Sequence, residues 1–392
     1  MKLPAGKKPA PSALLYLGGA RFGARPGALC EAHATARPVL GRRDLVRSLS
    51  ALWFVGAAAE ACASGRADPV MPDDGARIGP TRPLGSHVEL YSWFDLPRDD
   101  PRSRELSGIA WDESARTLWG VQDETGNIVA LVPDRELKRW GFGAVITLKM
   151  NFPLDLEGIV VTRDGFIVAS EKGPRVLEVD RLGKLRRDIP LPAHFAKARE
   201  NKSLESLSLS PDGRYLFTTN EAALSGDGEK ATAAKGTRLR ILRITRATGE
   251  MTEHAYATDP MPHEGGDYGV ADLAALSSDD LLVLERGWAH GSGNTARIYR
   301  VSIADPGTSC LAMAELTADA PVLSKKLFVD LSKLPAQGFP AAKQQQDSPL
   351  LDNYEGMALG PRLRDGRDTI IVISDDNARS DQFARILVLA IS

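Results

Sequence analysis

The chain alternates short apolar runs with polar turns from residue 86 to its end. Each run holds about four to seven residues and is bounded by Gly, Asp or Pro, and long helical periodicity is scarce. Runs of this length between turn residues are typical of β-strands. The pattern therefore predicts an all-β fold.

One two-strand unit recurs within this region. It begins with an acidic residue, passes through an apolar run, a turn and a second apolar run, and ends with another acidic residue, as in "DLEGIVVTRDGFIVASEKG" (155–173). A propeller blade takes about 40–50 residues. The units start at acidic residues spaced 52, 48, 67 and 83 residues apart, namely Glu105, Glu157, Glu205, Asp272 and Glu355. The shorter spacings indicate successive blades, and the longer ones require insertions.

These units predict a β-propeller over residues 85–392. Five blades are countable, and a sixth is open within 303–350, where "SCLAMAEL" and "KKLFVDL" offer two strands. The last unit ends at "ARILVLAIS" without a fourth strand, so we expect the strand at 86–97 to pair with it and close the ring. Closure of this kind removes exposed sheet edges. A β-sandwich would explain short strands but not their spacing.

Hairpin geometry gathers the acidic ends on one face of the ring. The start of the first strand and the end of the second lie at the same end of an antiparallel pair. If the first strand is innermost, its acids surround the channel. The ends of the second strands add Asp123, Glu124, Glu171, Glu221, Glu285, Asp375 and Asp376.

Clustered carboxylates repel one another, which raises their pKa values or recruits a cation. Six to eight oxygen ligands suit Ca²⁺, so we expect calcium as cofactor. The expected ligands are Glu105, Glu157, Glu171, Glu205, Glu221, Asp272, Glu285, Glu355 and Asp375. The alternative is architectural, because a carboxylate at the start of an inner strand can accept backbone N–H bonds from the next blade.

Basic residues follow the second-strand ends and are candidates for binding an anionic substrate. They are Lys172, Arg286 and Arg379. Such acidic–basic neighbours either bind a phosphate with calcium as the bridge or form solvated surface pairs. The sequence contains no G-x-S-x-G, P-loop or zincin motif, so no catalytic residue is assigned.

The first 62 residues predict an export signal. In "GRRDLVRSLSALWFVGAAAEACASG" the pair Arg42-Arg43 precedes Leu45, a short apolar stretch and small residues around Cys62. This order is typical of a twin-arginine signal, with cleavage near Ala61 or a lipid anchor at Cys62. A buried helix is the alternative, and residues 1–41 are either a long leading region or an over-called start. Residues 63–84 are expected to form a Pro/Gly-rich tether.

The net charge of the chain after removal of residues 1–61 limits the classes of partner that it is expected to bind. It holds 40 basic against 48 acidic residues, a formal charge of −8. An acidic protein is a poor partner for nucleic acid or anionic membranes, and no apolar run reaches the ~20 residues needed to span a bilayer. Three cysteines exclude a disulfide framework. We expect a monomer in the periplasm or anchored by lipid at the cell envelope.

Three motifs resemble the phytase-like family, also called the esterase-like activity of phytase family. They are "SLESLSLSPDGRYLFTTNEAAL", "GVADLAALSSDDLLVLERGW" and "NYEGMALGPRLRDGRDTIIVISDDN". The resemblance covers roughly residues 100–392 and implies an exported bacterial β-propeller that hydrolyses esters or phosphate esters. Its motif-matching residues include Asn220 and Asn377, which join the expected substrate-binding residues.

Two functions therefore remain open from the sequence. The first is a calcium-dependent hydrolase of small phosphoesters or carboxylesters. The second is a non-catalytic propeller that binds a small ligand, a cation or a protein through the same acidic face. A propeller fold decides neither.

Overall fold

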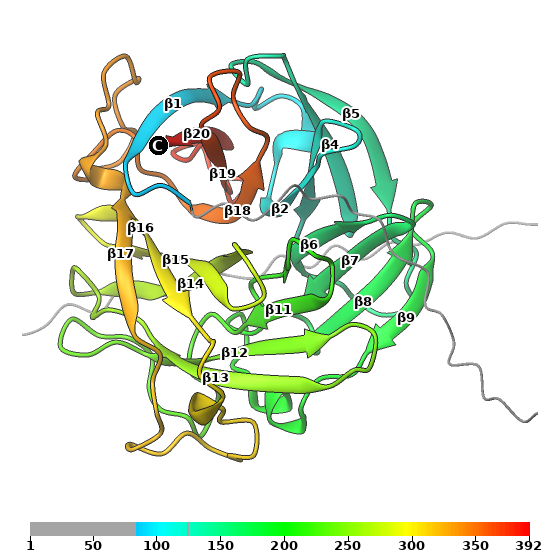
Figure 1. Ribbon diagram of the computed structural model, residues 1–392. Helices are drawn as coiled ribbons and strands as arrows, with labels where there is room; N and C mark the ends of the chain where they lie inside the picture. The colour runs from blue at the N-terminus through cyan, green and yellow to red at the C-terminus, as the bar shows by residue number, and fades with distance from the viewer. Residues whose placement is uncertain (1–83, 124) are drawn as a thin grey trace, which may run out of the picture. The chain divides into compact units, whose positions relative to one another are not determined.

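In the computed structural model, which describes residues 84–392 except 124, twenty strands form five four-stranded antiparallel sheets. The five sheets are arranged as blades around a ring (Figure 1). The expected export signal (1–62), nearly all of the tether, Cys62 and Glu124 lie outside the described residues. The all-β propeller expected from the sequence is confirmed.

The blades follow one another in chain order, each running from an inner to an outer strand. The first two blades comprise β2 (Leu106–Asp112), β3 (Thr117–Gln122), β4 (Asn127–Pro133) and β5 (Trp140–Thr147), then β6 (Leu156–Thr162), β7 (Gly165–Ser170), β8 (Arg175–Asp180) and β9 (Leu185–Ile189). The next two comprise β10 (Ser208–Leu209), β11 (Tyr215–Thr219), β12 (Arg238–Thr245) and β13 (Met251–Ala257), then β14 (Gly266–Ala275), β15 (Asp280–Ala289), β16 (Gly293–Ser302) and β17 (Lys325–Asp330).

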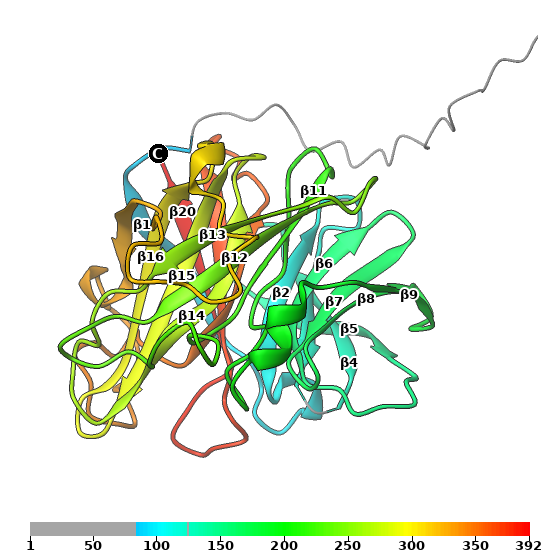
Figure 2. The same cartoon turned by 90° about the horizontal axis from the view of Figure 1, so that it is seen from below.

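The fifth blade closes the ring with strands from both ends of the described chain. It comprises β18 (Tyr354–Gly360), β19 (Asp368–Ser374), β20 (Arg385–Ile391) and, outermost, β1 (Val88–Asp95). β1 pairs antiparallel with β20 from Val88 opposite Ile391 to Asp95 opposite Arg385. Figure 2 shows β1 and β20 beside each other from a second direction. The expected closure by the strand at 86–97 is confirmed.

The sixth blade that the sequence left open within 303–350 does not form among the described residues. Within the described residues, "KKLFVDL" supplies β17, the outer strand of blade four, and "SCLAMAEL" forms no strand. The segment around Cys310 instead lies along the free edge of β13, where the Cys310 N–H donates to the Glu253 carbonyl at 2.7 Å and Leu323 N–H donates to the Ala255 carbonyl at 2.9 Å. Its apolar residues cover a sheet edge that would otherwise be exposed.

Apolar residues pack between adjacent blades rather than in one central core. Val121, Phe166 and Leu177 lie in a cluster between blades one and two, and Leu282, Tyr354 and Leu387 lie in one between blades four and five. A middle strand packed on both faces is buried along its whole length, as β19 and β20 nearly are. This explains why such strands are continuous apolar runs in the sequence.

Helical structure in the described residues is limited to four short 3₁₀ turns. They are η1 (Pro101–Ser103), η2 (Ala193–Lys197), η3 (Pro306–Thr308) and η4 (Leu331–Lys333). None of the helices described is long and apolar enough to cross a membrane.

Candidate functional site

In four of the five blades a bulge in the inner strand sets the residues that face the ring centre, and in blade three the corresponding residues lie in the irregular stretch before β10. In β6 and β18 the pairing skips one residue, which is Glu157 in the first case and Glu355 in the second. In a bulge the extra residue leaves the ladder and its side chain is re-aimed. Aligned on the bulge, the five blades carry Ser107, Glu157, Glu205, Ala271 and Glu355.

The residue after the bulge explains the recurring Glu-Gly pair. A Cβ placed on Gly356 would lie 2.4 Å from the Ser107 carbonyl oxygen of the neighbouring blade, and one on Gly158 would lie 2.7 Å from the Leu207 nitrogen. Both distances are below van der Waals contact. The inner strands therefore approach so closely that glycine is required at these two positions.

The end of each second strand adds one more charged residue. In four blades its backbone N–H donates to the carbonyl of a residue preceding the inner strand: Asp123 to Glu105 at 3.2 Å, Glu171 to Asp155 at 2.8 Å, Glu221 to Ser203 at 2.9 Å and Asp375 to Asn353 at 2.9 Å. Arg286 occupies the matching place in blade four, one residue beyond Glu285. The set is therefore four carboxylates and one guanidinium.

Three expected ligands occupy other places than the repeat suggested. Glu105 lies two residues before the bulge position, which Ser107 occupies. Asp272 lies one residue after it, and its Oδ2 accepts the Met357 N–H at 2.7 Å while Oδ1 accepts the Leu273 N–H at 2.8 Å. Asp272 thus joins the inner strands of blades four and five, which is the architectural use of such a carboxylate.

Glu285 faces the interface between blades three and four. Its carboxylate accepts hydrogen bonds from the Tyr256 hydroxyl, from the Tyr268 hydroxyl at 2.8 Å and from Lys325 Nζ at 2.5 Å. Because successive side chains of a strand point to opposite faces, Glu285 and Arg286 point apart. Arg286 therefore takes the place at the ring centre.

Five carboxyl groups, Asp123, Asp155, Glu157, Glu355 and Asp375, form what we call the acidic cluster. Burial raises the pKa of Asp123 to about 12, with further contributions from Glu157, Asp375 and Glu355. Burial and then Glu355 raise the pKa of Glu157 well above its usual range, although the Ser107 hydroxyl donates to Glu157 Oε2 at 2.6 Å. Oδ1 of Asp123 is buried and has no hydrogen-bond partner among the described residues. The surroundings of the cluster therefore supply too little positive charge to keep all of its carboxyl groups ionised.

Two basic residues, which we call the cation pair, border this cluster. Lys202 Nζ lies 2.6 Å from Glu221 Oε2 and 2.8 Å from Asp267 Oδ2. Arg286 Nη2 lies 2.6 Å from Glu355 Oε1, and its buried Nε has no partner among the described residues. Burial lowers the pKa of Lys202, but Glu221 and other carboxylates outweigh it and the pKa is raised. Glu355 and Glu221 therefore link a negative half of the site to a positive half.

Glu171 and Glu205 lie beside the same centre. Burial raises the pKa of Glu205 well above its usual range, and Glu221 adds to it. Burial also raises the pKa of Glu171, whose Oε1 accepts the Ser203 N–H at 2.7 Å. Both carboxylates are less than a tenth exposed.

The expected substrate-binding residues are scattered. Lys172 lies at the acidic cluster, with Nζ 3.3 Å from Asp155 Oδ2. Asn220 is buried, and its Oδ1 accepts the Arg240 N–H at 3.0 Å. Asn377 Nδ2 donates to Gln382 at 3.0 Å, and the exposed Arg379 pairs with Asp381 at 3.0 Å. Lys172 and Arg286 contact the clustered carboxylates through their side chains, and Asn377 does so through its backbone N–H, which donates to Asp375 Oδ1 at 2.9 Å.

Lys202 was missed by sequence reasoning. It lies in the irregular segment before the short β10, where no strand period marks its side chain. Lys202 lies three positions before the acid of "LES", but the first unit has a basic residue, Arg102, at the same spacing before Glu105, so the spacing alone did not single out Lys202. Its role becomes visible only when Glu221 and Asp267, distant in sequence, are seen around it.

The site suits calcium in its chemistry but is not preassembled for it. All the acidic donors are oxygens, as Ca²⁺ prefers, and the partnerless Asp123 oxygen is an open ligand. Among the described residues, however, no three His, Cys, Asp or Glu side chains are gathered closely enough to hold one metal ion. Calcium binding would therefore require the carboxylates to move together.

Comparison with known proteins finds a similar sequence and several structures of low similarity. A protein from Arthroderma benhamiae described as an uncharacterized secreted protein is 27% identical over 249 residues, 53% of this chain and 47% of that protein, so the chain spans about half the length of this curated relative. The structure of a periplasmic gluconolactonase from Pseudomonas aeruginosa has a TM-score of 0.33 at 14% identity, covering 72% of this chain and 85% of that one. A luciferin-regenerating enzyme has a TM-score of 0.37 at 14% identity, covering 79% and 95%.

Structural similarities of this size do not bear on the activity of the chain. The sequence itself matches the phytase-like family, described as esterase-like activity of phytase, over residues 101–378. This match spans well over half of the chain and all five inner strands. The chain belongs to the phytase-like family.

Proposed function

We propose that this chain is an exported hydrolase of small phosphoesters or carboxylesters that uses calcium at the acidic cluster. The observation that carries the proposal is the pairing of an uncompensated, buried carboxylate cluster with the adjacent cation pair. Such a pairing offers a base for water on one side and a holder for an anionic oxygen on the other. The family description supports ester hydrolysis as the reaction class.

The residues of the chain would divide the reaction between them. The attacking water bonds to the phosphorus or carbonyl carbon and passes its proton to a carboxylate of the acidic cluster. Arg286 and Lys202 stabilise the negative charge that develops on the ester oxygen. The ester bond then breaks, and the carboxyl group returns the proton to the leaving alcohol. Bound calcium supplies Lewis acidity that polarises the ester oxygen and favours ionised carboxylates.

Export is part of the same proposal. The curated relative from Arthroderma benhamiae is described as secreted, and the arginine pair at 42–43 has the form of a twin-arginine signal. We place the mature chain in the periplasm or, through Cys62, on a lipid anchor at the envelope. Alkaline fractionation of cells that express the full chain separates the two. A lipid anchor predicts wild type in the membrane fraction and C62A in the soluble fraction, whereas a periplasmic chain predicts both proteins in the soluble fraction.

Hydrolysis of p-nitrophenyl phosphate and p-nitrophenyl acetate by the purified mature protein tests the activity. We expect activity that EDTA removes and Ca²⁺ restores. Glu157→Gln should lower kcat by about 100-fold or more, the usual contribution of general acid–base catalysis. Arg187→Gln is the matched control, since Arg187 is exposed on β9 and pairs only with Glu178 among the contacts described here.

The second candidate is a non-catalytic propeller that binds a cation or small ligand through the same centre. It is favoured by one observation: the cation pair is already neutralised by Glu221, Asp267 and Glu355. If neither ester is hydrolysed with any divalent metal, while calcium still binds, the binding function replaces the hydrolase.

A further inference from the structure

A pocket lies at the outer edge of blade three, away from the ring centre. It has a volume of about 360 Å³ and is lined by Ala193, His194 and Lys197 of η2 and by residues 311–314. This volume equals that of about twelve water molecules at ~30 Å³ each and falls within the usual range for small-molecule sites, roughly 300–1,000 Å³.

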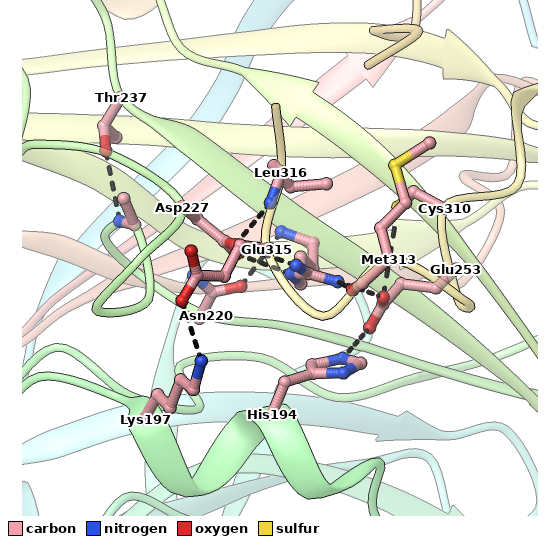
Figure 3. A network of polar contacts seen from close by, with 12 residues as sticks. His194, Lys197, Asn220, Asp227, Thr237, Glu253, Cys310, Met313, Glu315 and Leu316 are labelled. Carbon is pink, nitrogen blue, oxygen red and sulfur yellow. Dashed lines mark hydrogen bonds and ion pairs between the residues drawn. The ribbon is translucent and has the colours of Figure 1, made fainter. Parts of the chain in front are cut away.

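One wall of the pocket is fixed through His194. Its Nε2 lies 2.8 Å from Glu253 Oε1, and its side chain is 10% exposed while that of Glu253 is fully buried. Figure 3 shows the imidazole rising from η2 toward Glu253. Because a carboxylate accepts only, Nε2 carries the proton and donates to Glu253, so His194 holds this wall in place and Lys197 is the donor that faces an anionic ligand.

The opposite wall is fixed by the same buried network. Arg240, fully buried, donates to both oxygens of Asp227, to Glu253 Oε2 at 2.8 Å and to the Met313 carbonyl at 3.1 Å. Asp227 Oδ1 also accepts the Leu316 N–H at 2.8 Å. Both walls are thus held by one ion network (Figure 3), so the space between them is preorganised and does not depend on a ligand to form.

The lining combines an apolar surface with two nitrogen-bearing side chains. Leu311, Met313 and two alanines form the apolar wall, and Lys197 and His194 lie on the other side. Lys197 Nζ pairs with Glu315 Oε1 at 3.0 Å, but both side chains are about half exposed. Such a pair contributes ~0–1 kcal/mol, so a ligand carboxylate can replace Glu315 at little cost.

Other occupants fit less well. A metal cation would find few ligands, because both oxygens of Glu253 are engaged by His194 and Arg240 and the Glu315 carboxylate is about half exposed. A phosphate is normally held by guanidinium forks, and the only arginine of this network, Arg240, is committed to carboxylates. Covalent chemistry at Cys310 is disfavoured, since burial, followed by Glu253, raises the pKa of its thiol to about 12.

From these contacts we propose that the pocket is a binding site for a monocarboxylate with a short apolar chain. The carboxylate accepts from Lys197 Nζ, and the chain lies along Leu311 and Met313. The site is separate from the acidic cluster and does not depend on the proposed hydrolase function.

Isothermal titration of the mature protein with hexanoate tests the proposal, with hexan-1-ol as the uncharged analogue. We expect saturable 1:1 binding of hexanoate at least tenfold tighter than of hexanol. Lys197→Met should weaken hexanoate binding about tenfold or more and bring it to the level of hexanol. Lys138→Met is the matched control, since Lys138 forms an equally exposed pair with Glu136 at 2.9 Å on blade one.

A variant that fills the pocket tests the proposal without changing any charge. Ala312 is exposed on the rim of the pocket, so Ala312→Trp should block hexanoate while leaving the thermal unfolding midpoint unchanged. Equal binding by the wild type, Lys197→Met and Ala312→Trp would overturn the proposal, as would equal affinities for hexanoate and hexanol or no binding at millimolar hexanoate.

Discussion

Asp123→Asn should stabilise the metal-free protein at pH 8 and do little at pH 5. In the unfolded chain an aspartate has a pKa of about 3.9, whereas burial and neighbouring carboxylates raise the pKa of Asp123 to about 12 in the folded chain. Between these values the folded state holds a proton that the unfolded state has released. The contribution of Asp123 to the free energy of unfolding is therefore most favourable below about pH 4 and becomes less favourable as the pH rises.

The size of the effect follows from the same linkage. One retained proton costs about 1.36 kcal/mol of folding free energy per pH unit, or about 4 kcal/mol between pH 5 and pH 8. Because the carboxyl groups of the acidic cluster share their protons, substitution of one of them should recover about half of this, ~2 kcal/mol. Asparagine keeps the shape of the side chain and carries no charge at either pH.

Urea unfolding in EDTA at both pH values measures the difference, with Asp188→Asn as the control substitution. Asp188 is exposed on β9 and pairs with Arg175 at 2.6 Å, so its substitution should change the free energy of unfolding by less than about 1 kcal/mol at both pH values. If Asp123→Asn destabilises the protein as much at pH 8 as at pH 5, the picture of an uncompensated acidic cluster is wrong.

Three further predictions concern the scaffold. Gly356→Ala should destabilise the protein by at least ~2 kcal/mol in the same urea assay, because the added Cβ would lie 2.4 Å from the Ser107 carbonyl oxygen. Gly141→Ala is the control and should be neutral, because its added Cβ would have no atom within 4 Å. Arg240→Met should cost about 3–5 kcal/mol by leaving Asp227 and Glu253 buried without their partner; a loss below 1 kcal/mol in chemical denaturation would contradict this. Removal of β1, in a chain truncated before residue 96, should expose the β20 edge and cause aggregation seen by light scattering; a monomeric, native-like product would refute the need for closure.

The sequence predicted the blades well because each blade depends on local patterns. Apolar runs separated by turns such as "TRDG" and "SPDG" mark the first two strands of most blades. Because strands buried on both faces have no solvent-facing side, they appear in the sequence as uninterrupted apolar runs that are easy to recognise. The closing strand was also predictable, since the last blade lacked a partner for "ARILVLAIS".

The site was predicted only in part, because its register depends on bulges that the sequence does not mark. In blade four the acids Asp272 and Glu285 each lie one residue from the positions that face the centre, which Ala271 and Arg286 occupy. A shift of one residue turns a strand side chain to the opposite face. An apolar run bordered by an acidic residue therefore has two outcomes. It places Glu157 at the ring centre, whereas it places Glu285 at the interface between two blades, where Glu285 accepts hydrogen bonds.

Titration of calcium into EDTA-stripped mature protein at pH 7.5, followed by calorimetry, tests the central claim most directly. The account predicts saturable calcium binding by the wild type that is weakened at least tenfold in Glu157→Gln and unchanged in Arg187→Gln. Absence of calcium binding by the wild type, or equal binding by all three proteins, would contradict it.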